Sequence, residues 1–421
     1  MQTGIDALAF AGPAHYIDLA RLAEARNVEP AKFLHGLGQK RMAIASPCED
    51  TVTMAVDAGA AALRRFDIDP ASIGTLIVGT ETGIDHSKPV AVYAHELLGL
   101  DERCRTFETK HACYGAMAGL TASMDWIASG RARGRKALVI ASDIARYGLN
   151  TAGEPTQGAG AVAMVVDAEP RLLAIDPAHI GDYTRQVMDF WRPLYSKYAF
   201  ADGHYSIECY LEALTAARGD AIGERELLPE RAACLYHVPF PRMAWKAHRR
   251  QLEIEHGGEA SDEAMKQSYR EQVAPWLTLN AEIGNIYTGS LFLALIDLLR
   301  QAPERMSGRN ISLFSYGSGC GATYCLGEVQ PAAAEWSAAL DPAPHLANRR
   351  ELDIAVYEDW TLKAESADRA ERLDPADYEL GDGIHYVGTR EHRRQYARTE
   401  QSAVSGTQGE LGQAGSDLQS A

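Results

Sequence analysis

Short apolar runs alternate with longer helical segments along most of the chain, a pattern typical of α/β proteins. The apolar runs predict strands at residues 75–80, 138–142, 161–166, 234–237 and 311–315. The longer segments predict helices at residues 51–66, 89–98, 114–129 and 286–300. The first of these helices follows Asp50, which is a good N-cap residue, and the last carries apolar residues at helical spacing.

Two glycine-rich segments form a weak internal repeat. The segments QGAGAVAMVV (157–166) and YGSGCGATYC (316–325) share a G-x-G followed by a strand-like run, and each lies late in its half of the chain. This favours a duplicated α/β unit. A chance match explains the same observation equally well.

Two regions depart from the alternation. Residues 326–376 are rich in Ala, Glu and Asp, which predicts exposed helices. The stretch from about Thr399 to Ala421 is polar, small and glycine-rich. It lacks the apolar content needed to fold alone, so we expect a disordered tail at 399–421 rather than a functional arm.

Length and composition place few limits on this picture. The chain has 421 residues, of which 46% are hydrophobic, enough for one large two-part domain or two domains. No run approaches the roughly 18 to 20 apolar residues that span a membrane. The first residues, MQTGIDALAF, lack the basic and apolar regions of a secretory signal.

Cysteine usage and charge exclude some kinds of site and partner. The seven cysteines are odd in number, scattered and without a CxxC pair, which argues against a disulfide framework and against a structural zinc site. A reducing cytoplasm is the simplest interpretation. The net charge of -16 disfavours nucleic acid as a partner, and any phosphate-bearing substrate would need local cations.

A cysteine with reactive surroundings lies in HACYGAMAGLTASMDWIASG (111–130). Cys113 precedes several small residues and is predicted to lie where a loop enters a helix. Unpaired N–H groups at a helix start favour the thiolate and lower a cysteine pKa. The alternative is a buried structural cysteine.

A carboxylate follows a strongly apolar strand in GTETGIDHSKP (79–89). Glu81 is flanked by glycines, a setting that suits an acid or base in a pocket, where burial raises the pKa. An exposed loop glutamate explains the same pattern.

A histidine and a basic stretch follow another strand in LYHVPFPRMAWKAHRR (235–250). His237 precedes two prolines that stiffen the loop, so it is a candidate acid or base near neutral pH, or else a core histidine with one hydrogen bond. If the following segment is a helix, Arg242, Lys246 and Arg249 lie on one face, where they would hold phosphates or form a solvated surface.

Two polar residues lie in glycine-rich settings beside apolar runs. Asn285 occurs in NAEIGNIYTGSLFLAL (280–295), and Ser318 occurs in LFSYGSGCGA (313–322). Such positions allow a ligand to approach the backbone or an amide to contact a thioester oxygen. Each signal is weak alone.

Taken together, these segments resemble one family, the 3-hydroxy-3-methylglutaryl-CoA synthases of the thiolase-like condensing enzymes. The resemblance covers residues 4–397. Its motifs are LAEARNVEPAKF, TETGID, ACYGA, SDIARYGLNTAGEPTQGAGAVAMV, VMDFWRP, DGHYSIECYL, YHVPF, GNIYTGSL and FSYGSG. The resemblance implies a five-layered αβαβα fold built from two similar halves, here residues 1–168 and 169–398, and a homodimer.

The resemblance also implies roles for three catalytic residues. Cys113, in the ACY motif, corresponds to the acyl acceptor. Glu81, in the TE-x-x-x-D motif, corresponds to the general acid/base. His237, in the H-x-P-F motif, corresponds to the partner of the cysteine and of the second substrate.

Further residues are implied to bind the substrates. These are Tyr147 at the acetyl site, Thr156, Ser206, Asn285 and Ser318 near the acyl groups, and Lys246 as a coenzyme A contact. One position departs from the family pattern, because Arg242 stands five residues past the histidine where lysine is usual. The guanidinium keeps the charge and can still hold a phosphate, so we expect altered coenzyme A affinity and retained activity.

The implied reaction joins acetyl-CoA to acetoacetyl-CoA. Cys113 takes the acetyl group, Glu81 removes a methyl proton, and the carbanion adds to the ketone polarised by His237. Backbone N–H groups near the cysteine would stabilise the enolate oxygen. Water then releases the product, with no metal and no redox cofactor.

Three alternatives stay open at this point. Polyketide β-branching synthases use the same three residues but take acyl groups from acyl carrier proteins, and the segment PCEDTVT (47–53) resembles that branch. The segment SDIARYGLNTAGEPTQGAGAVAMV and the two cations at 242 and 246 favour the coenzyme A enzymes of the mevalonate pathway. An inactive thiolase-like partner subunit would not need all three catalytic residues. A plain β-ketoacyl synthase or thiolase fits TETGID and HVPF less well.

Overall fold

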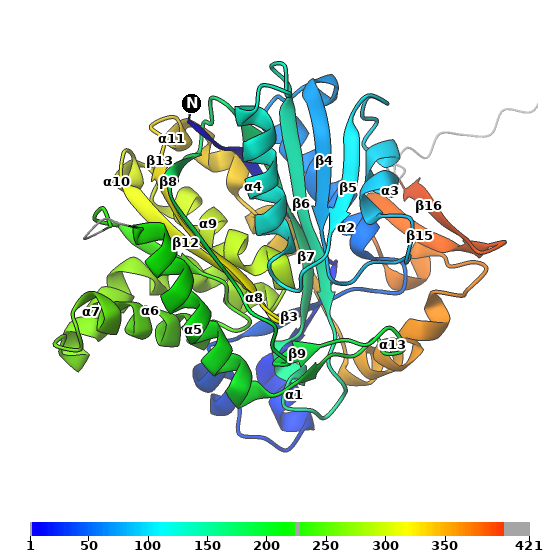
Figure 1. The fold of residues 1–421 in the computed structure, drawn as a ribbon. Coiled ribbons are helices and arrows are strands. Elements are labelled where there is room, and N and C mark those ends of the chain that lie inside the picture. Colours follow the sequence, from blue (N-terminus) through cyan, green and yellow to red (C-terminus); the bar gives the residue numbers. More distant parts are fainter. Residues whose placement is uncertain (1, 224–227, 400–421) are drawn as a thin grey trace, which may run out of the picture.

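A nine-stranded mixed sheet dominates the computed structural model, which describes residues 2–223 and 228–399 (Figure 1). From one edge to the other, the strands are β11 (Ala233–Tyr236), β12 (Asn310–Gly317), β13 (Gly321–Val329), β8 (Leu173–Thr184), β1 (Thr3–Ala11), β7 (Gly158–Asp167), β6 (Lys136–Ala145), β4 (Ile73–Gly79) and β5 (Arg105–Thr109).

The sheet consists of two sets of strands with the same topology. In the first set β1 is antiparallel to β7, β7 is antiparallel to β6, and β6 is parallel to β4. The second set repeats this pattern with β8, β13, β12 and β11. The glycine-rich segments of the internal repeat lead into β7 and β13, which occupy equivalent places. The expectation of two similar halves is therefore confirmed.

The two sets meet edge to edge. Residues 3–5 of β1 pair with residues 173–175 of β8, so one hydrogen-bonded sheet runs through both halves. β5 pairs with β4 and extends the first set only. β7 ends at Asp167 and β8 begins at Leu173, while the division of the chain at residue 168 stays a prediction.

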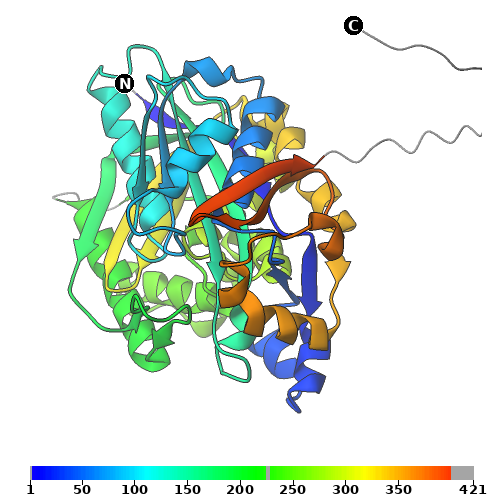
Figure 2. The same cartoon turned by 90° about the vertical axis from the view of Figure 1, so that its right-hand side faces the viewer.

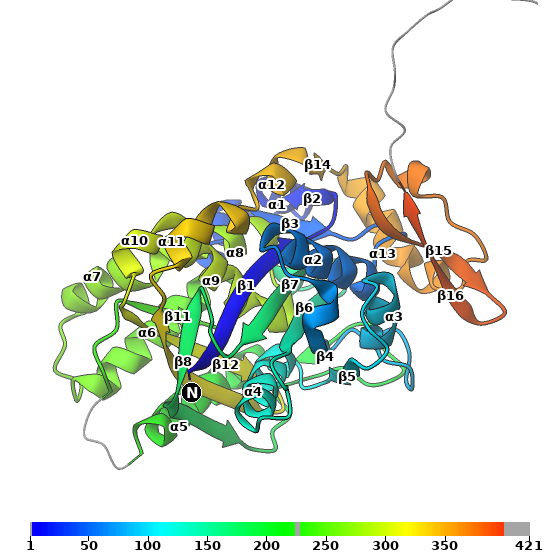
Figure 3. The same ribbon diagram turned by 90° about the horizontal axis from the view of Figure 1, so that it is seen from above.

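Helices pack on the sheet in both halves (Figure 3). α2 (Thr51–Arg65) and α4 (Gly115–Ala128) contact the first set of strands, and α5 (Gly203–Ile222) and α9 (Ser290–Gln301) contact the second. Buried side chains of α4 and α9 share one core with both sets, whereas α5 packs into a second cluster. This layering agrees with the expected αβαβα architecture.

α2 illustrates how the sequence fixes a helix start. Asp50 adopts extended backbone angles and accepts hydrogen bonds from the N–H groups of Val52 and Thr53. The Thr53 hydroxyl accepts a bond from the Asp50 N–H at 2.9 Å, which completes a capping box. Eleven of its fifteen residues are buried, so packing against the sheet stabilises the rest of the helix.

Smaller elements surround this body. A three-stranded sheet is formed by β14 (Arg350–Glu351), β2 (His15–Asp18) and β3 (Arg41–Ile44). β9 (Phe190–Trp191) pairs with β10 (Phe200–Ala201), and the hairpin β15 (Gly383–Arg390) and β16 (Arg393–Thr399) lies against α2 (Figure 2). The remaining helices are α1 (Leu19–Ala25), α3 (Val90–Leu97), α6 (Arg242–Glu255), α7 (Asp262–Gln272), α8 (Thr278–Ile283), α10 (Pro303–Met306), α11 (Ala333–Trp336), α12 (Ala343–Asn348) and α13 (Ile354–Ala367).

The predicted strands and three of the four predicted helices agree with the structure to within a few residues. The helix predicted from residue 286 is wrong at its start, because α9 begins at Ser290 after a loop in which Gly284 and Tyr287 have positive φ angles of 88° and 45°. Residues 326–376 are only partly helical, since they include the end of β13, and Tyr357 of α13 is buried rather than exposed.

Three further expectations, about the tail, the cysteines and membrane-spanning helices, can be compared with the structure. Thr399 ends β16, and residues 400–421 of the predicted tail lie outside the described residues. All seven cysteines lie in described parts of the chain, and all are free thiols. Within residues 2–223 and 228–399 no helix is long and apolar enough to cross a membrane.

Candidate active site

Three of the predicted site residues follow the carboxyl ends of parallel strands. Glu81 comes after β4, His237 comes directly after β11, and Ser318 comes directly after β12. β12 ends beside the cysteine loop, because a Cβ on Gly317 would lie 2.4 Å from the His111 carbonyl oxygen and 2.6 Å from Tyr114 Cβ. The fold thus brings the end of the second set of strands against the loop that carries Cys113.

Cys113 lies at the start of α4, as predicted. Tyr114 is the N-cap, and the cysteine side chain is half-buried. The Sγ atom lies 3.7 Å from Glu81 Oε1 and is placed to donate its proton there. Gly79 allows this approach, since a Cβ at that position would lie 2.4 Å from the Ala116 nitrogen.

The expected low pKa of Cys113 is wrong in direction. Burial, and then the negative charge of Glu81, hold the pKa of the thiol well above its ordinary value. One N–H of the first helical turn is also not available to the sulfur, because Ala116 donates to Thr288 Oγ1 at 2.6 Å. A thiol with such a pKa would need a base in order to act as a nucleophile, and the Glu81 carboxyl group lies within reach of the sulfur.

Glu81 is a buried carboxyl group with an opposing cation. Its side chain is only 7% exposed, and this burial raises its pKa to about 8 against the lowering effect of Arg192. Arg192 contacts it twice, with Nη2 at 3.0 Å from Oε2 and Nη1 at 2.7 Å from the main-chain oxygen. A carboxyl group with this pKa exchanges protons readily near neutral pH.

Asp143, for which the sequence predicted no role, supports the loop that carries Glu81. Its Oδ1 accepts hydrogen bonds from the Glu81 N–H at 2.9 Å and from the hydroxyls of Thr80 and Thr82 at 2.9 and 2.7 Å. Its Oδ2 accepts one from the Thr288 N–H at 3.4 Å. Asp143 is fully buried, and burial raises its pKa. It joins the Glu81 loop to the segment that precedes α9.

His237 is neutral in this site. The residue is 3% exposed, and burial lowers its pKa to about 3. Its Nδ1 has no hydrogen-bond partner among the described residues, while the Tyr210 hydroxyl donates to its main-chain oxygen at 2.8 Å. The expectation of a histidine that titrates near neutral pH is wrong, and the ring is suited to donate a hydrogen bond from a neutral imidazole.

Three of the predicted substrate-binding residues gather around one loop. Tyr147 packs edge-on against Tyr287 at 6.5 Å between ring centroids, and nearby Cys113 and Glu81 contribute to raising its pKa after burial. The Asn285 N–H donates to the Thr156 carbonyl oxygen at 3.2 Å. Asn285 Oδ1 already accepts from the Tyr287 N–H at 2.9 Å, so this oxygen shapes the loop.

Ser206 and Ser318 are connected through a residue that the sequence interpretation missed. Asp189 is fully buried and accepts hydrogen bonds from Ser206 Oγ at 3.2 Å, the Tyr316 hydroxyl at 2.7 Å and the Gly319 N–H at 2.9 Å. It therefore fixes the loop of Ser318 against the start of α5. The motif VMDFWRP contains this aspartate. An acidic residue between apolar ones does not indicate in the sequence that its carboxylate accepts three hydrogen bonds.

The predicted cationic face borders an open groove between α5 and α6. The prediction of one face is confirmed, because Arg242, Lys246 and Arg249 all line this groove of about 840 Å³. Its other lining residues are Glu208, Leu211, Glu212, Thr215, Ala216, Trp245, Arg250 and Glu253. The cations are exposed and sit on the helix that begins five residues after His237.

Comparison with known proteins identifies the family. Residues 1–170 match the model for the N-terminal part of hydroxymethylglutaryl-coenzyme A synthase, and residues 255–399 match the model for its C-terminal part. The chain belongs to the hydroxymethylglutaryl-CoA synthase family. It is 42% identical over 362 residues to hydroxymethylglutaryl-CoA synthase of Enterococcus faecalis, covering 85% of this chain and 91% of that protein.

Members of both branches are similar in sequence and in structure. A polyketide biosynthesis 3-hydroxy-3-methylglutaryl-ACP synthase of Bacillus subtilis is 33% identical, covering 85% of this chain and 87% of that protein. The structure of MvaS with 3-hydroxy-3-methylglutaryl coenzyme A has a TM-score of 0.87 and 46% identity over 94% of this chain and 99% of that one. The structure of the curacin pathway HMG synthase with its holo donor-ACP has a TM-score of 0.89 and 32% identity. The match covers 95% of this chain and 100% of that one.

Proposed function

We propose that this hydroxymethylglutaryl-CoA synthase family member condenses acetyl-CoA with acetoacetyl-CoA and water to give 3-hydroxy-3-methylglutaryl-CoA for the mevalonate pathway. The observation that carries the proposal is the pair of Cys113 Sγ and Glu81 Oε1, 3.7 Å apart at the start of α4. A thiol beside a buried carboxylate supplies both a nucleophile and a base for acyl transfer followed by carbon–carbon bond formation.

In the first step the Cys113 sulfur attacks the thioester carbonyl of acetyl-CoA. The thiol proton passes to Glu81, and Glu81 returns it to the coenzyme A sulfur as that bond breaks. Because the pKa of Cys113 is high, proton transfer accompanies the attack instead of preceding it. The products are acetyl-Cys113 and free coenzyme A, and Glu81 is again ionised.

In the second step Glu81 removes a proton from the acetyl methyl group. The carbanion adds to the C3 ketone of acetoacetyl-CoA, which the neutral imidazole of His237 polarises by donating a hydrogen bond. Glu81 returns its proton to the new C3 oxygen. Water then hydrolyses the Cys113 thioester, which frees the thiol, leaves a carboxylate on the product and releases one proton to solvent.

The remaining predicted residues bind the substrates in this proposal. Tyr147, Thr156 and Asn285 shape the acetyl site, and Ser206 and Ser318 lie at the second acyl group. Arg242 and Lys246 hold coenzyme A phosphates in the groove between α5 and α6, where they provide cations against a net charge of -16. The enzyme works without a metal or redox cofactor, as a homodimer in the cytoplasm.

Replacing both groove cations, as Arg242→Gln with Lys246→Gln, is expected to raise the KM for both coenzyme A substrates by about tenfold and leave kcat nearly unchanged. These side chains bind a remote part of the substrate equally in the ground and transition states. Steady-state kinetics measures this directly. Arg64→Gln on the exposed face of α2 is the matched control and should change neither constant. A fall in kcat at unchanged KM would contradict the assignment.

The choice between coenzyme A and carrier-protein donors has a direct test. The protein is incubated with acetyl-CoA, or with an acetylated acyl carrier protein, and its intact mass is recorded. We expect an added acetyl group from acetyl-CoA, in line with the higher identity to the Enterococcus enzyme than to the Bacillus polyketide enzyme. Transfer from the carrier protein alone would move the assignment to polyketide β-branching. If neither donor transfers an acetyl group, the proposed reaction is ruled out.

A further inference from the structure

A short flap between β8 and α5 reaches into the site described above. The flap (residues 187–201) contains the two-stranded ribbon β9–β10, whose Trp191 and Phe200 rings stack at 6.0 Å between centroids. Most of its large apolar side chains are exposed, but Arg192 turns inward and is 13% exposed. An inward cation on a segment whose large apolar side chains are mostly exposed requires an explanation within the site.

The two carboxylate oxygens of Glu81 face different partners, Arg192 and Cys113. Its Nη2 lies 3.0 Å from Oε2, and its Nη1 donates to the Glu81 main-chain oxygen at 2.7 Å. The other carboxylate oxygen, Oε1, faces Cys113 Sγ at 3.7 Å. Because the guanidinium is planar, contact with both the main chain and the side chain of one residue fixes the carboxylate's rotation. Without it, either oxygen could turn away from the sulfur.

The charge of Arg192 also acts on the protonation of Glu81. Within the described parts of the chain, the groups with the largest effects on the Glu81 carboxyl are Arg192, Asp143 and Cys113, and among these three Arg192 alone favours ionisation by its charge. The rings of Tyr147 and Tyr287 lie near this centre, and the Arg192 guanidinium carbon is 5.4 Å from the Tyr287 ring centroid. The charge of Arg192 therefore opposes the effect of burial on the Glu81 pKa. A second guanidinium, that of Arg146, lies near Arg192, and burial followed by the Arg192 charge lowers its pKa.

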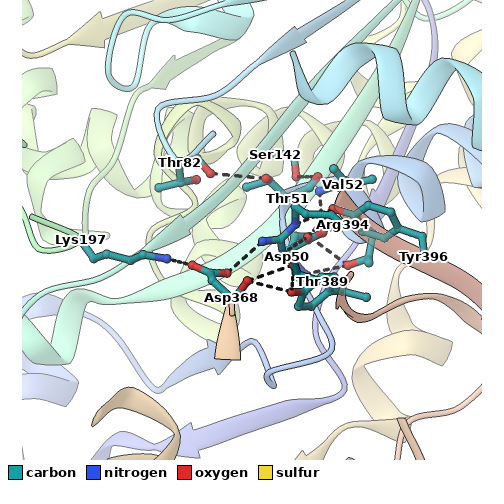
Figure 4. Close-up of polar contacts among 12 residues, drawn as sticks. Asp50, Thr51, Val52, Thr82, Ser142, Lys197, Asp368, Thr389, Arg394 and Tyr396 are labelled. Carbon is teal, nitrogen blue, oxygen red and sulfur yellow. Dashed lines mark hydrogen bonds and ion pairs between the residues drawn. The ribbon is translucent and has the colours of Figure 1, made fainter. Parts of the chain in front are cut away.

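The flap is anchored on both sides of Arg192. On one side Asp189 binds Ser206, Tyr316 and Gly319, as described above. On the other side Lys197 forms an ion pair with Asp368, which pairs in turn with Arg394 at 3.1 Å (Figure 4). The Asp189 hydrogen bonds and the Lys197–Asp368 ion pair thus restrain the flap on either side of Arg192.

The second anchor continues into the body of the protein. Arg394 Nη2 lies 2.8 Å from Asp50 Oδ2, so the hairpin is tied to the residue that caps α2 (Figure 4). The next residue, Thr51, donates from its hydroxyl to the Thr82 carbonyl oxygen at 3.4 Å, and Thr82 directly follows Glu81. The flap and the Glu81 loop are thus held by the same set of polar contacts.

We propose that Arg192 is a positioning residue that holds Glu81 with Oε1 toward Cys113 and keeps it available as a base, and that the Lys197–Asp368–Arg394 contacts hold Arg192 in place. The inference rests on the proposed function, because it assigns Arg192 a part in that reaction. Arg192 acts through Glu81 and does not contact the reacting atoms.

Arg192→Gln tests the inference through the pH dependence of the condensation. Removing the cation disfavours ionised Glu81, so the pH at which the rate reaches half its maximum should move upward. At pH 7 we expect kcat to fall about 10²-fold while the KM for acetyl-CoA stays within twofold. Arg192→Lys keeps the charge without the planar fork, so it should restore the wild-type pH profile and only part of the rate. An unchanged pH profile in Arg192→Gln would overturn the inference.

Lys197→Ala tests the anchor separately. We expect a fall in kcat of roughly tenfold with the same upward shift of the pH profile, since Arg192 would lose its fixed place. Lys363→Ala removes a lysine from an ion pair with Asp359 on α13 and is the matched control, expected to behave as wild type. Wild-type kinetics for Lys197→Ala would overturn the role of the anchor. Product formation by the wild type, measured first, separates failure of the proposed function from failure of this inference.

Discussion

Cys113→Ser is expected to abolish acetylation by acetyl-CoA and to lower turnover by about 10⁴-fold or more. The proposed reaction depends on a covalent thioester, and a serine hydroxyl is a far weaker nucleophile and a poorer leaving group in the final hydrolysis. Intact mass should show an added acetyl group on the wild type and none on the variant. Folding should be retained, because sulfur and oxygen are similar in size and the side chain is half-buried.

Cys104→Ser is the control for this measurement. Cys104 precedes β5 and is buried, and it already has a polar contact with Thr106 Oγ1 at 3.9 Å, so a hydroxyl is tolerated there. This variant should be acetylated like the wild type. Acetylation of Cys113→Ser at the wild-type rate would mean that another residue is the nucleophile.

Glu81→Gln is expected to lower the condensation rate by about 10³-fold and to remove its pH dependence below pH 8. The carboxylate accepts a proton only when ionised, and its pKa is raised to about 8, so the wild-type rate should rise with pH and level off near that value. An amide accepts no proton at any of these pH values. The rate of the acetylation step should fall less than that of condensation, because a thiol is a stronger acid than the acetyl methyl group.

Glu108→Gln controls for the loss of a half-buried carboxyl group near the same end of the sheet. Glu108 lies on β5 and accepts a hydrogen bond from the Val90 N–H at 2.8 Å, which a glutamine oxygen can also accept. Single-turnover measurements of acetylation and of condensation separate the two steps. Equal losses in both steps, or an unchanged pH profile in Glu81→Gln, would contradict the role of Glu81 as the carbon base.

The alternation of apolar and amphipathic segments predicted most of the core but missed strands with charged residues. β1 was missed because Asp6 interrupts its apolar run, yet Asp6 is 1% exposed and is paired with Lys136 at 3.1 Å and Arg171 at 2.7 Å. The hairpin β15–β16 was missed because its second strand is rich in arginine. Both are stabilised by ion pairs between distant segments, which a local pattern does not reveal.

The candidate site was predictable as far as its residues follow strands. Glu81 and His237 come after apolar runs, and Cys113 comes before a helix of small residues. Arg192 was not predictable in this way, since it lies 111 residues from the Glu81 group that it binds. The same limit explains the error about the Cys113 pKa, because the sequence suggested the helix start and not the depth of burial beside a carboxylate.

The hydrogen bonds between β1 and β8 bear on how substrates enter. Two halves joined through a continuous sheet cannot open like a hinged clamshell without breaking main-chain pairing in the core. Exchange of coenzyme A, acetoacetyl-CoA and product must then depend on local fluctuations of surface loops, which occur within nanoseconds to microseconds. In the proposed reaction, turnover is then limited by the chemical steps and by loop motion, with little delay from large-scale closure.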